Sequence, residues 1–469
     1  MKKKIGAILV AGALACTMTA GVALSGCGAK ITEFEMPEDG YDGSKVTITF
    51  ATTTGQKLTN IIKDTIKDFN VLYPNITVVL DDTVKQYPTL HDNIMDKIGT
   101  NKQPNIAFCY ADHVADYNMS GAVLAIDDFL PGGAYKDVTV TNTAGTESMG
   151  LTQTQYSDYV DSFFAEGKVF GDGHVYTLPF AKSTEVMYYN EDFFGKYNLK
   201  VPQTWDEMEK LCEEVKGIFG GDTSKYPLGY DSDANLFITL CKQYNAPYTS
   251  ASDEKHFQFD NETSKEFLER LVDWVGKGYL VTQSTNNDSY TSYLFTEERC
   301  IMSIGSTGGA SYQDPGSTDG QAQFNVGVAR IPQIDPEDPQ AILQGPSVCI
   351  FKKENPQEVL ASWLLVKYLT TDANFQGRYS EASGYMPVTK SAYNSDLYQE
   401  FLKEDGLTAR TAKTCKQMVD DDAFYTSDAF FGSSKARERV EILMKSVLNG
   451  GDIGAALRAA IKACEDYIG

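Results

Sequence analysis

The chain is poor in histidine and tryptophan, and it lacks the motifs of the common enzyme classes. Its 469 residues include only 3 Trp and four histidines, which are His91, His113, His174 and His256. No two histidines stand at metal-ligand spacing, and there is no serine nucleophile elbow, Walker loop or dinucleotide-binding glycine motif. We therefore expect no catalytic residues, no metal and no cofactor, although the many carboxylates leave a glycosidase pair open.

Basic residues are outnumbered by acidic ones. The chain has 41 Lys and Arg against 64 Asp and Glu, so its formal net charge is −23 at pH 7. Such a charge opposes binding to nucleic acid and to anionic lipid surfaces, because both are themselves negative. We expect no nucleic-acid partner, and the charge suits a protein crowded at a cell surface.

The one long apolar run lies at the N-terminus. Three lysines precede an apolar stretch from Ile5 to Leu24, and small residues lead from it to Cys27. This order is typical of a lipoprotein signal. A membrane-spanning helix needs about 20 strongly apolar residues, whereas this run is rich in Gly, Ala and Thr. We predict a signal peptide over residues 1–26, lipidation at Cys27, and anchoring by lipid at the extracellular face of the cell membrane.

The composition changes after the predicted cleavage site. Residues 27–44 hold Pro37, Gly40 and Gly43, several acids and little to bury, which predicts a flexible tether. The rest of the chain is too long for one hydrophobic core, because cores stop growing at about 250–300 residues. We therefore expect two large lobes.

Cysteines are few and widely spaced. Apart from Cys16 and Cys27 there are seven, which are Cys109, Cys212, Cys241, Cys300, Cys349, Cys415 and Cys464. The number is odd and several lie in apolar surroundings, so we expect buried free thiols rather than a disulfide framework, with one or two disulfides left open.

Strand and helix patterns alternate along the folded part. Residues 46–50, 76–80 and 104–108 are typical of strands, and apolar residues at helical spacing fill 58–72 between the first two. This order predicts an α/β lobe with a largely parallel sheet, and a second α/β region starts near residue 156.

Three helix starts are marked by capping residues. Thr204 precedes Glu207 by three positions, and Thr263 precedes Glu266 in the same way, so each pair predicts a capping box. Asp452 is expected to cap the last helix.

Tyrosine and phenylalanine are abundant. The chain has 27 Tyr and 24 Phe. Tyrosine offers a flat apolar face and a hydroxyl, a combination that suits sugar rings and polyols. Most of these residues are nevertheless expected in the core and on the surface.

Five segments together resemble one known family. They are Phe69–Ile76, Tyr176–Asn190, Val201–Glu207, Ser383–Val388 and Phe431–Arg437. In this order they are similar to the family 1 extracellular solute-binding proteins of ABC importers, and most of all to the glycerol-3-phosphate-binding branch and its sugar-binding relatives.

The resemblance implies a fold and a partner. The implied fold is α/β, two-lobed and periplasmic-binding-protein-like, with a ligand cleft between the lobes. We expect residues 45–155 and 306–354 in the first lobe and residues 156–305 and 355–469 in the second. The implied partners are the permease subunits of an ABC importer, to which the lobes deliver a ligand after closing around it.

Seven residues match ligand-binding positions of the resembled family. They are Tyr87, Asp112, Ser183, Ser306, Gly345, Tyr385 and Arg437. The residues themselves leave plainer alternatives open: Tyr385 packs the lobe interface, Arg437 pairs with Glu441, Ser183 caps a turn, and Asp112 caps a helix.

One departure from the glycerol-phosphate branch concerns the ligand. Tryptophans are missing from Asp231–Phe237, which carries Asp231 and Asp233 instead, and acids there would repel a phosphate. We therefore expect a carbohydrate ligand, with glycerol-3-phosphate or a glycerophosphodiester as the alternative. A surface-anchored glycosidase and a receptor without a transporter remain as alternatives of other classes.

Overall fold

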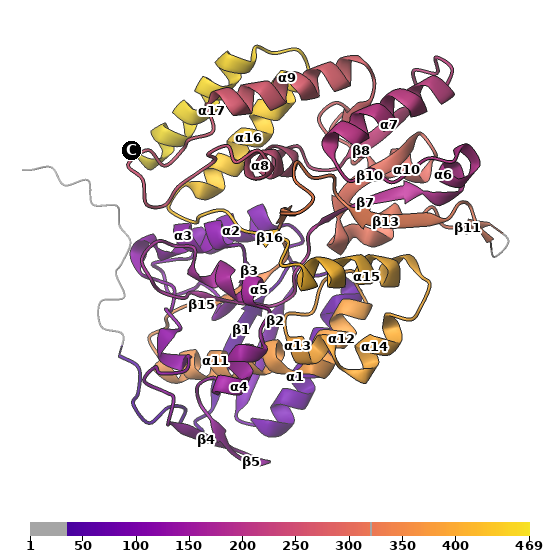
Figure 1. Cartoon of the computed structure of the whole chain (residues 1–469). Coiled ribbons are helices and arrows are strands. Elements are labelled where there is room, and N and C mark those ends of the chain that lie inside the picture. Colours follow the sequence, from indigo (N-terminus) through magenta and orange to yellow (C-terminus); the bar gives the residue numbers. More distant parts are fainter. Residues whose placement is uncertain (1–34, 319–320) are drawn as a thin grey trace, which may run out of the picture.

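The computed structural model describes residues 35–318 and 321–469. The predicted signal peptide, Cys27 and the first part of the predicted tether lie outside these residues. The described chain forms two α/β bodies, each built on a five-stranded sheet, and Figure 1 shows one below the other. The predicted two-lobed α/β fold is therefore confirmed.

The sheet of the first lobe has the order β2-β1-β3-β15-β6. Its strands are β1 (Val46–Ala51), β2 (Ile76–Asp81), β3 (Ile106–Cys109), β15 (Ser347–Ile350) and β6 (Thr177–Pro179). β1 runs parallel to β2 and β3, whereas β15 pairs antiparallel with β3 and β6. The predicted parallel β-α-β-α-β start is present, and two later strands complete the sheet.

Helices cover this sheet with their apolar faces. They include α1 (Gln56–Leu72), α2 (Tyr87–Met95), α3 (Ala111–Tyr117), α11 (Pro356–Thr371) and α12 (Ala373–Glu381). α1 buries one stripe at helical spacing, as expected of a helix at the surface of a domain. α11 is buried nearly all round, because it lies against β1 on one side and α1 and α12 on the others.

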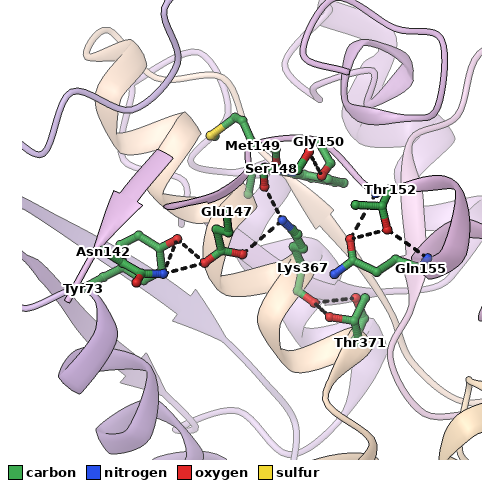
Figure 2. A network of polar contacts seen from close by, with 12 residues as sticks. Tyr73, Asn142, Glu147, Ser148, Met149, Gly150, Thr152, Gln155, Lys367 and Thr371 are labelled. Atoms are coloured by element: carbon green, nitrogen blue, oxygen red, sulfur yellow. Dashed lines mark hydrogen bonds and ion pairs between the residues drawn. The ribbon is translucent and has the colours of Figure 1, made fainter. Parts of the chain in front are cut away.

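A small hairpin is fastened to α11 by a polar network (Figure 2). β4 (Thr139–Asn142) pairs with β5 (Gly145–Ser148). The carboxylate of Glu147 accepts hydrogen bonds from the Tyr73 hydroxyl at 2.6 Å and the Asn142 amide at 2.7 Å. The ammonium of Lys367, on α11, lies 3.2 Å from the same carboxylate. Burial lowers the pKa of Lys367, and Glu147 counteracts that effect.

The sheet of the second lobe has the order β13-β7-β10-β8-β9. Its strands are β13 (Val326–Arg330), β7 (Glu185–Asn190), β10 (Cys300–Ser306), β8 (Tyr226–Tyr230) and β9 (Leu280–Thr282). β7 is antiparallel to both neighbours, and β10, β8 and β9 are mutually parallel.

The helices of the second lobe gather above this sheet (Figure 1). They include α7 (Trp205–Ile218), α8 (Asp233–Gln243), α9 (Glu262–Gly276), α16 (Ser433–Leu448) and α17 (Ile453–Ile468). Their inward residues form one cluster with the strands, separate from the cluster of the first lobe.

The other elements are short or lie between the lobes. They are η1 (Asn118–Ser120), η2 (Asp127–Phe129), α4 (Gln153–Asp158), α5 (Asp161–Ala165), η3 (Glu166–Lys168), α6 (Glu191–Tyr197), α10 (Ser292–Thr296), η4 (Thr307–Gln313), β11 (Ser317–Thr318), β12 (Gln321–Ala322), β14 (Ala341–Ile342), α13 (Lys390–Tyr393), α14 (Asp396–Phe401), α15 (Leu407–Asp420) and β16 (Phe424–Tyr425).

Three segments lie in the lobe opposite to the one predicted. Within residues 306–354, expected in the first lobe, β13 pairs with β7 of the second sheet. Within residues 156–305, expected in the second lobe, β6 pairs with β15 of the first sheet. Within residues 355–469, also expected in the second lobe, α11 and α12 pack on β1 and α1. A short apolar strand or an all-round apolar helix fits either sheet, so its pattern does not select one.

Three segments cross between the lobes and hydrogen-bond to one another. The backbone N–H of Lys182 donates to Met386 at 3.1 Å, and that of Ser183 donates to Gln344 at 2.9 Å. The crossing segments are therefore joined to one another by backbone hydrogen bonds at the lobe boundary.

One predicted capping box is present and the other is wrong. Thr204 and Glu207 cap α7 reciprocally. α9 begins at Glu262, one residue before Thr263, because the side chain of Asn261 at the N-cap accepts a 2.9 Å hydrogen bond from the N–H of Ser264. Asp452 caps α17 as expected.

All seven cysteines after Cys27 are free and buried, which confirms the prediction of buried thiols. Burial raises the pKa of each of Cys109, Cys212, Cys241 and Cys300, as an apolar environment disfavours a thiolate. Within residues 35–318 and 321–469, no helix has the length and apolar character needed to cross a bilayer.

Candidate functional site

A cavity lies between the two lobes, beside the crossing segments. The first lobe contributes residues at the start of α3 and in η3, and the second contributes residues of α8 and α16 and of the loop before α16. Its side chains combine aromatic, acidic and basic groups, which are Tyr110, Asp112, Glu166, Tyr248, Asp428 and Arg437.

Tyr110 is the aromatic centre of this site. Its ring lies 4.4 Å from the ring of Tyr87, centroid to centroid. Burial raises the pKa of Tyr110 well above its usual value; Tyr385 adds to this, and the positive charge of Arg437 opposes it. Asp112 and Arg437 line the same cavity as Tyr110, and Tyr87 lies beside its ring, so three of the predicted residues surround a tyrosine that was not predicted.

Asp112 occupies the first turn of α3 but does not cap it. The N-cap position belongs to Tyr110, and Oδ1 of Asp112 accepts a hydrogen bond from the adjacent N–H of His113 at 2.9 Å. No group in the described chain donates to Oδ2. The carboxylate lines the cavity and is thus placed to accept hydrogen bonds.

Arg437 is held by a chain of buried polar groups. Its Nη2 donates to Oδ1 of Asn235, whose Nδ2 donates to Glu185 at 2.8 Å. The Tyr230 hydroxyl donates to the other oxygen of Glu185 at 2.5 Å. Burial raises the pKa of Glu185 to about 7, against the opposing effect of these donors. Arg437 therefore bonds Asn235 rather than forming an ion pair with Glu441.

Ser183, Ser306 and Gly345 lie together at the crossing segments. The Ser306 hydroxyl is 3.5 Å from the Ser183 hydroxyl. Gly345 has φ of +86°, and a Cβ there would lie 2.5 Å from the carbonyl oxygen of Ala181. Only glycine fits this position without displacing the backbone.

Tyr385 reaches from the first lobe to the glycine-rich loop that follows β10. A Cβ on Gly308 would lie 2.9 Å from Cζ of the Tyr385 ring, so the ring packs directly on this glycine. The plainer alternative for Tyr385, packing at the lobe boundary, therefore agrees with this contact.

The two acids after β8 do not line the cavity. Oδ1 of Asp231 accepts hydrogen bonds from the N–H groups of Thr291 at 2.7 Å and Ser292 at 3.0 Å. Asp233 accepts one from Ser284 at 3.0 Å. Burial raises the pKa of both carboxyls. The expectation that these acids would face the ligand is wrong, because neighbouring loops use them as hydrogen-bond acceptors.

Sequence reasoning missed four of the cavity residues. Tyr110 stands two positions before Asp112 in the same loop, and that proximity was a usable signal. Glu166, Tyr248 and Asp428 come from loops or short helices with no motif, and only the tertiary structure brings them to the cavity. No group of three or more His, Cys, Asp or Glu side chains suited to a metal occurs among the described residues.

Comparison with known proteins identifies relatives of this chain. Residues 64–405 match the family model described as bacterial extracellular solute-binding protein. The chain is 23% identical over 296 residues to the sn-glycerol-3-phosphate-binding periplasmic protein UgpB of Brucella melitensis, which covers 60% of this chain and 61% of the relative. The chain is 24% identical over 269 residues to UgpB of Escherichia coli K12, and this alignment covers 54% of the chain and 57% of the relative. The alignments thus span less than two thirds of these relatives.

Solved structures share the fold. UgpB of Mycobacterium tuberculosis in complex with glycerophosphocholine superposes with a TM-score of 0.70 at 20% identity, over 91% of this chain and 99% of that one. The cyclic alpha-maltosyl-1,6-maltose binding protein of Arthrobacter globiformis gives a TM-score of 0.69 at 15% identity, with the same coverage. Since the family model matches well over half of the residues, the chain belongs to the bacterial extracellular solute-binding proteins, which are binding proteins and not enzymes.

Proposed function

We propose that the chain is the substrate-binding subunit of an ABC importer and that it captures a mono- or oligosaccharide. The observation that carries this proposal is the mixed lining of the cavity. Tyr110 and Tyr248 offer aromatic faces, and Asp112 offers a carboxylate oxygen without a donor among the described residues. Sugar rings present apolar C–H faces and hydroxyl donors, so they match both kinds of group.

Closure of the lobes is the mechanism that we propose for capture. Residues of both lobes line the cavity, and the hydrogen-bonded crossing segments lie beside it. A ligand that contacts both lobes binds the closed form more tightly and shifts the population towards it. The closed form would then dock on the permease, and a lipid on Cys27 would hold the protein at the extracellular face of the membrane.

Glycerol-3-phosphate or a glycerophosphodiester is the second candidate ligand. Arg437 supports it, since a guanidinium can hold two phosphate oxygens at once. The position of Asp231 and Asp233 away from the cavity removes one objection to a phosphate. The relatives from Brucella melitensis and Escherichia coli are named sn-glycerol-3-phosphate-binding proteins.

A thermal-shift screen of the chain from Lys30 onward tests the proposal. The panel holds sugars, oligosaccharides, polyols, glycerol-3-phosphate and glycerophosphodiesters. A ligand at 100 times its Kd should add about 2.7 kcal/mol to the free energy of unfolding and raise Tm. A sugar that shifts Tm supports the carbohydrate proposal, a shift from phosphate esters alone supports the second candidate, and no shift from any compound contradicts both.

A further inference from the structure

Glu166 is a charged side chain buried at the wall of the cavity. It starts η3, it is only 4% exposed, and it lines the cavity together with Tyr110 and Arg437. Its Oε2 accepts a hydrogen bond from the Ser347 hydroxyl at 2.6 Å and forms an ion pair with Lys182. The first-lobe sheet and a crossing segment thus hold one of its two oxygens.

Lys182 is fully occupied by these protein groups. Its side chain is completely buried. Besides Glu166, its ammonium donates to the Ser347 hydroxyl at 2.9 Å and to the carbonyl of Gly345 at 3.2 Å. An ammonium has three donor positions, and all three are used. Lys182 therefore has no donor left for a ligand.

The second oxygen of Glu166 has no such partner. Within the described residues no group donates to Oε1, although the side chain is buried beside the cavity. Oε1 is not among the fully buried unpaired polar atoms of the described chain, so it is open to the cavity, and a ligand there can donate a hydrogen bond to it. Among the described residues, the other charged groups that line the cavity are Asp112 and Asp428, both acidic, and Arg437, the single basic one.

We propose that Oε1 of Glu166 accepts a hydroxyl hydrogen bond from the bound ligand and thereby selects a polyhydroxylated molecule over one that places a phosphate at this wall. This inference rests on the proposed binding function and chooses between its two ligand classes. A sugar hydroxyl donates to a carboxylate, whereas an ionised phosphate oxygen and a carboxylate oxygen are both acceptors and cannot bond each other. Arg437 then serves as a donor to ring or hydroxyl oxygens.

Glu166→Gln tests the proposal by calorimetric titration with the sugar that shifts Tm and with glycerol-3-phosphate. The amide keeps the size of the side chain and an oxygen for Lys182 and Ser347, and it presents an N–H₂ donor in place of Oε1. We expect the affinity for the sugar to fall about tenfold or more, and that for the phosphate ester to stay equal or rise. Equal sugar affinity in Glu166→Gln and the wild type overturns the proposal.

A matched control separates this effect from loss of a buried ion pair. Glu147 also pairs with a buried lysine, Lys367, but does not line the cavity (Figure 2). Glu147→Gln should leave sugar affinity unchanged. If Glu166→Gln does not fold, the double variant Glu166→Gln, Lys182→Met removes the unpaired ammonium, and wild-type affinity in that variant overturns the proposal. A wild type that binds no sugar overturns this proposal and the proposed carbohydrate function together.

Discussion

The Ser434 hydroxyl, in the first turn of α16, donates a hydrogen bond of 2.6 Å to Oδ2 of Asp116 on α3. Asp116 belongs to the first lobe and α16 to the second, and the two helices pack on each other (Figure 1). The same carboxylate accepts a 3.2 Å hydrogen bond from the N–H of Gly432, the N-cap residue of α16. One lobe therefore caps a helix of the other, one turn before Arg437.

Asp116→Ala should weaken both folding and ligand binding. Asp116 is 1% exposed, so its removal leaves the N–H of Gly432 and the Ser434 hydroxyl without their partner. We expect a loss of about 1–3 kcal/mol in the free energy of unfolding, measured by urea denaturation, and a several-fold rise in Kd. Asp92→Ala is the control. Both Asp116 and Asp92 lie within hydrogen-bond distance of the His91 ring, at 3.1 and 3.0 Å, but Asp92 is exposed and contacts no second-lobe residue among the hydrogen bonds of the described chain. Equal effects of the two variants would contradict the capping role.

Glu185 should make the protein less stable as the pH rises. Its folded pKa, about 7, is raised above the ordinary value of 4.5, chiefly by burial, so the folded state binds its proton more tightly. Glu185 therefore adds up to about 3 kcal/mol to the free energy of unfolding. This gain is complete below the pKa of Glu185 in the unfolded chain, and it is lost as the pH rises through the pKa in the folded protein.

Glu185→Gln should flatten this dependence. Denaturation of both proteins from about pH 5 to about pH 8 compares the two slopes. His91 contributes in the same direction in both proteins: burial lowers its pKa, but Asp116 and Asp92 outweigh that effect. Identical slopes for variant and wild type would show that Glu185 does not titrate in this range.

Arg437→Ala should separate the two candidate ligands. Its guanidinium is the only basic group among the described residues that line the cavity. A phosphate ester should lose about 100-fold or more in affinity, because a charge-assisted bidentate contact disappears, whereas a neutral sugar should lose about tenfold at most. Arg439→Ala is the control, since Arg439 lies on the same helix but outside the cavity lining. A phosphate ester that binds Arg437→Ala normally would contradict the role of Arg437 in binding phosphate.

Asn261→Ala should destabilise the chain more than Thr263→Ala. The side chain of Asn261 caps α9, whereas Thr263 lies within the helix after the cap. Loss of an N-cap costs about 1 kcal/mol. Thermal denaturation should therefore give the lower Tm for Asn261→Ala, and the reverse order would contradict the assigned helix start.

The sequence alone predicted the local features whose cause lies within a few residues. Alternation and helical spacing place β1, α1 and β2 within a residue or two of their observed bounds, and the capping box at Thr204 follows from side chains three positions apart. The seven buried thiols follow from the apolar residues around them. Resemblance to a family added the two-lobed fold and named Tyr87, whose ring lies beside Tyr110, and Arg437, which lines the cavity together with Tyr110.

What the tertiary structure decided depends on residues far apart in the chain. β6 and β13 are short apolar strands, and which sheet each joins depends on edges supplied by β15 and β7, more than 100 residues away along the chain. Glu166 has no motif, yet folding sets it beside Lys182, Ser347 and the cavity wall. Asp231 was expected to face the ligand and instead caps a distant turn. Local pattern fixes the elements because their energetics are local, whereas pairing and burial between elements fix the site, since those free energies exist only once the lobes have formed.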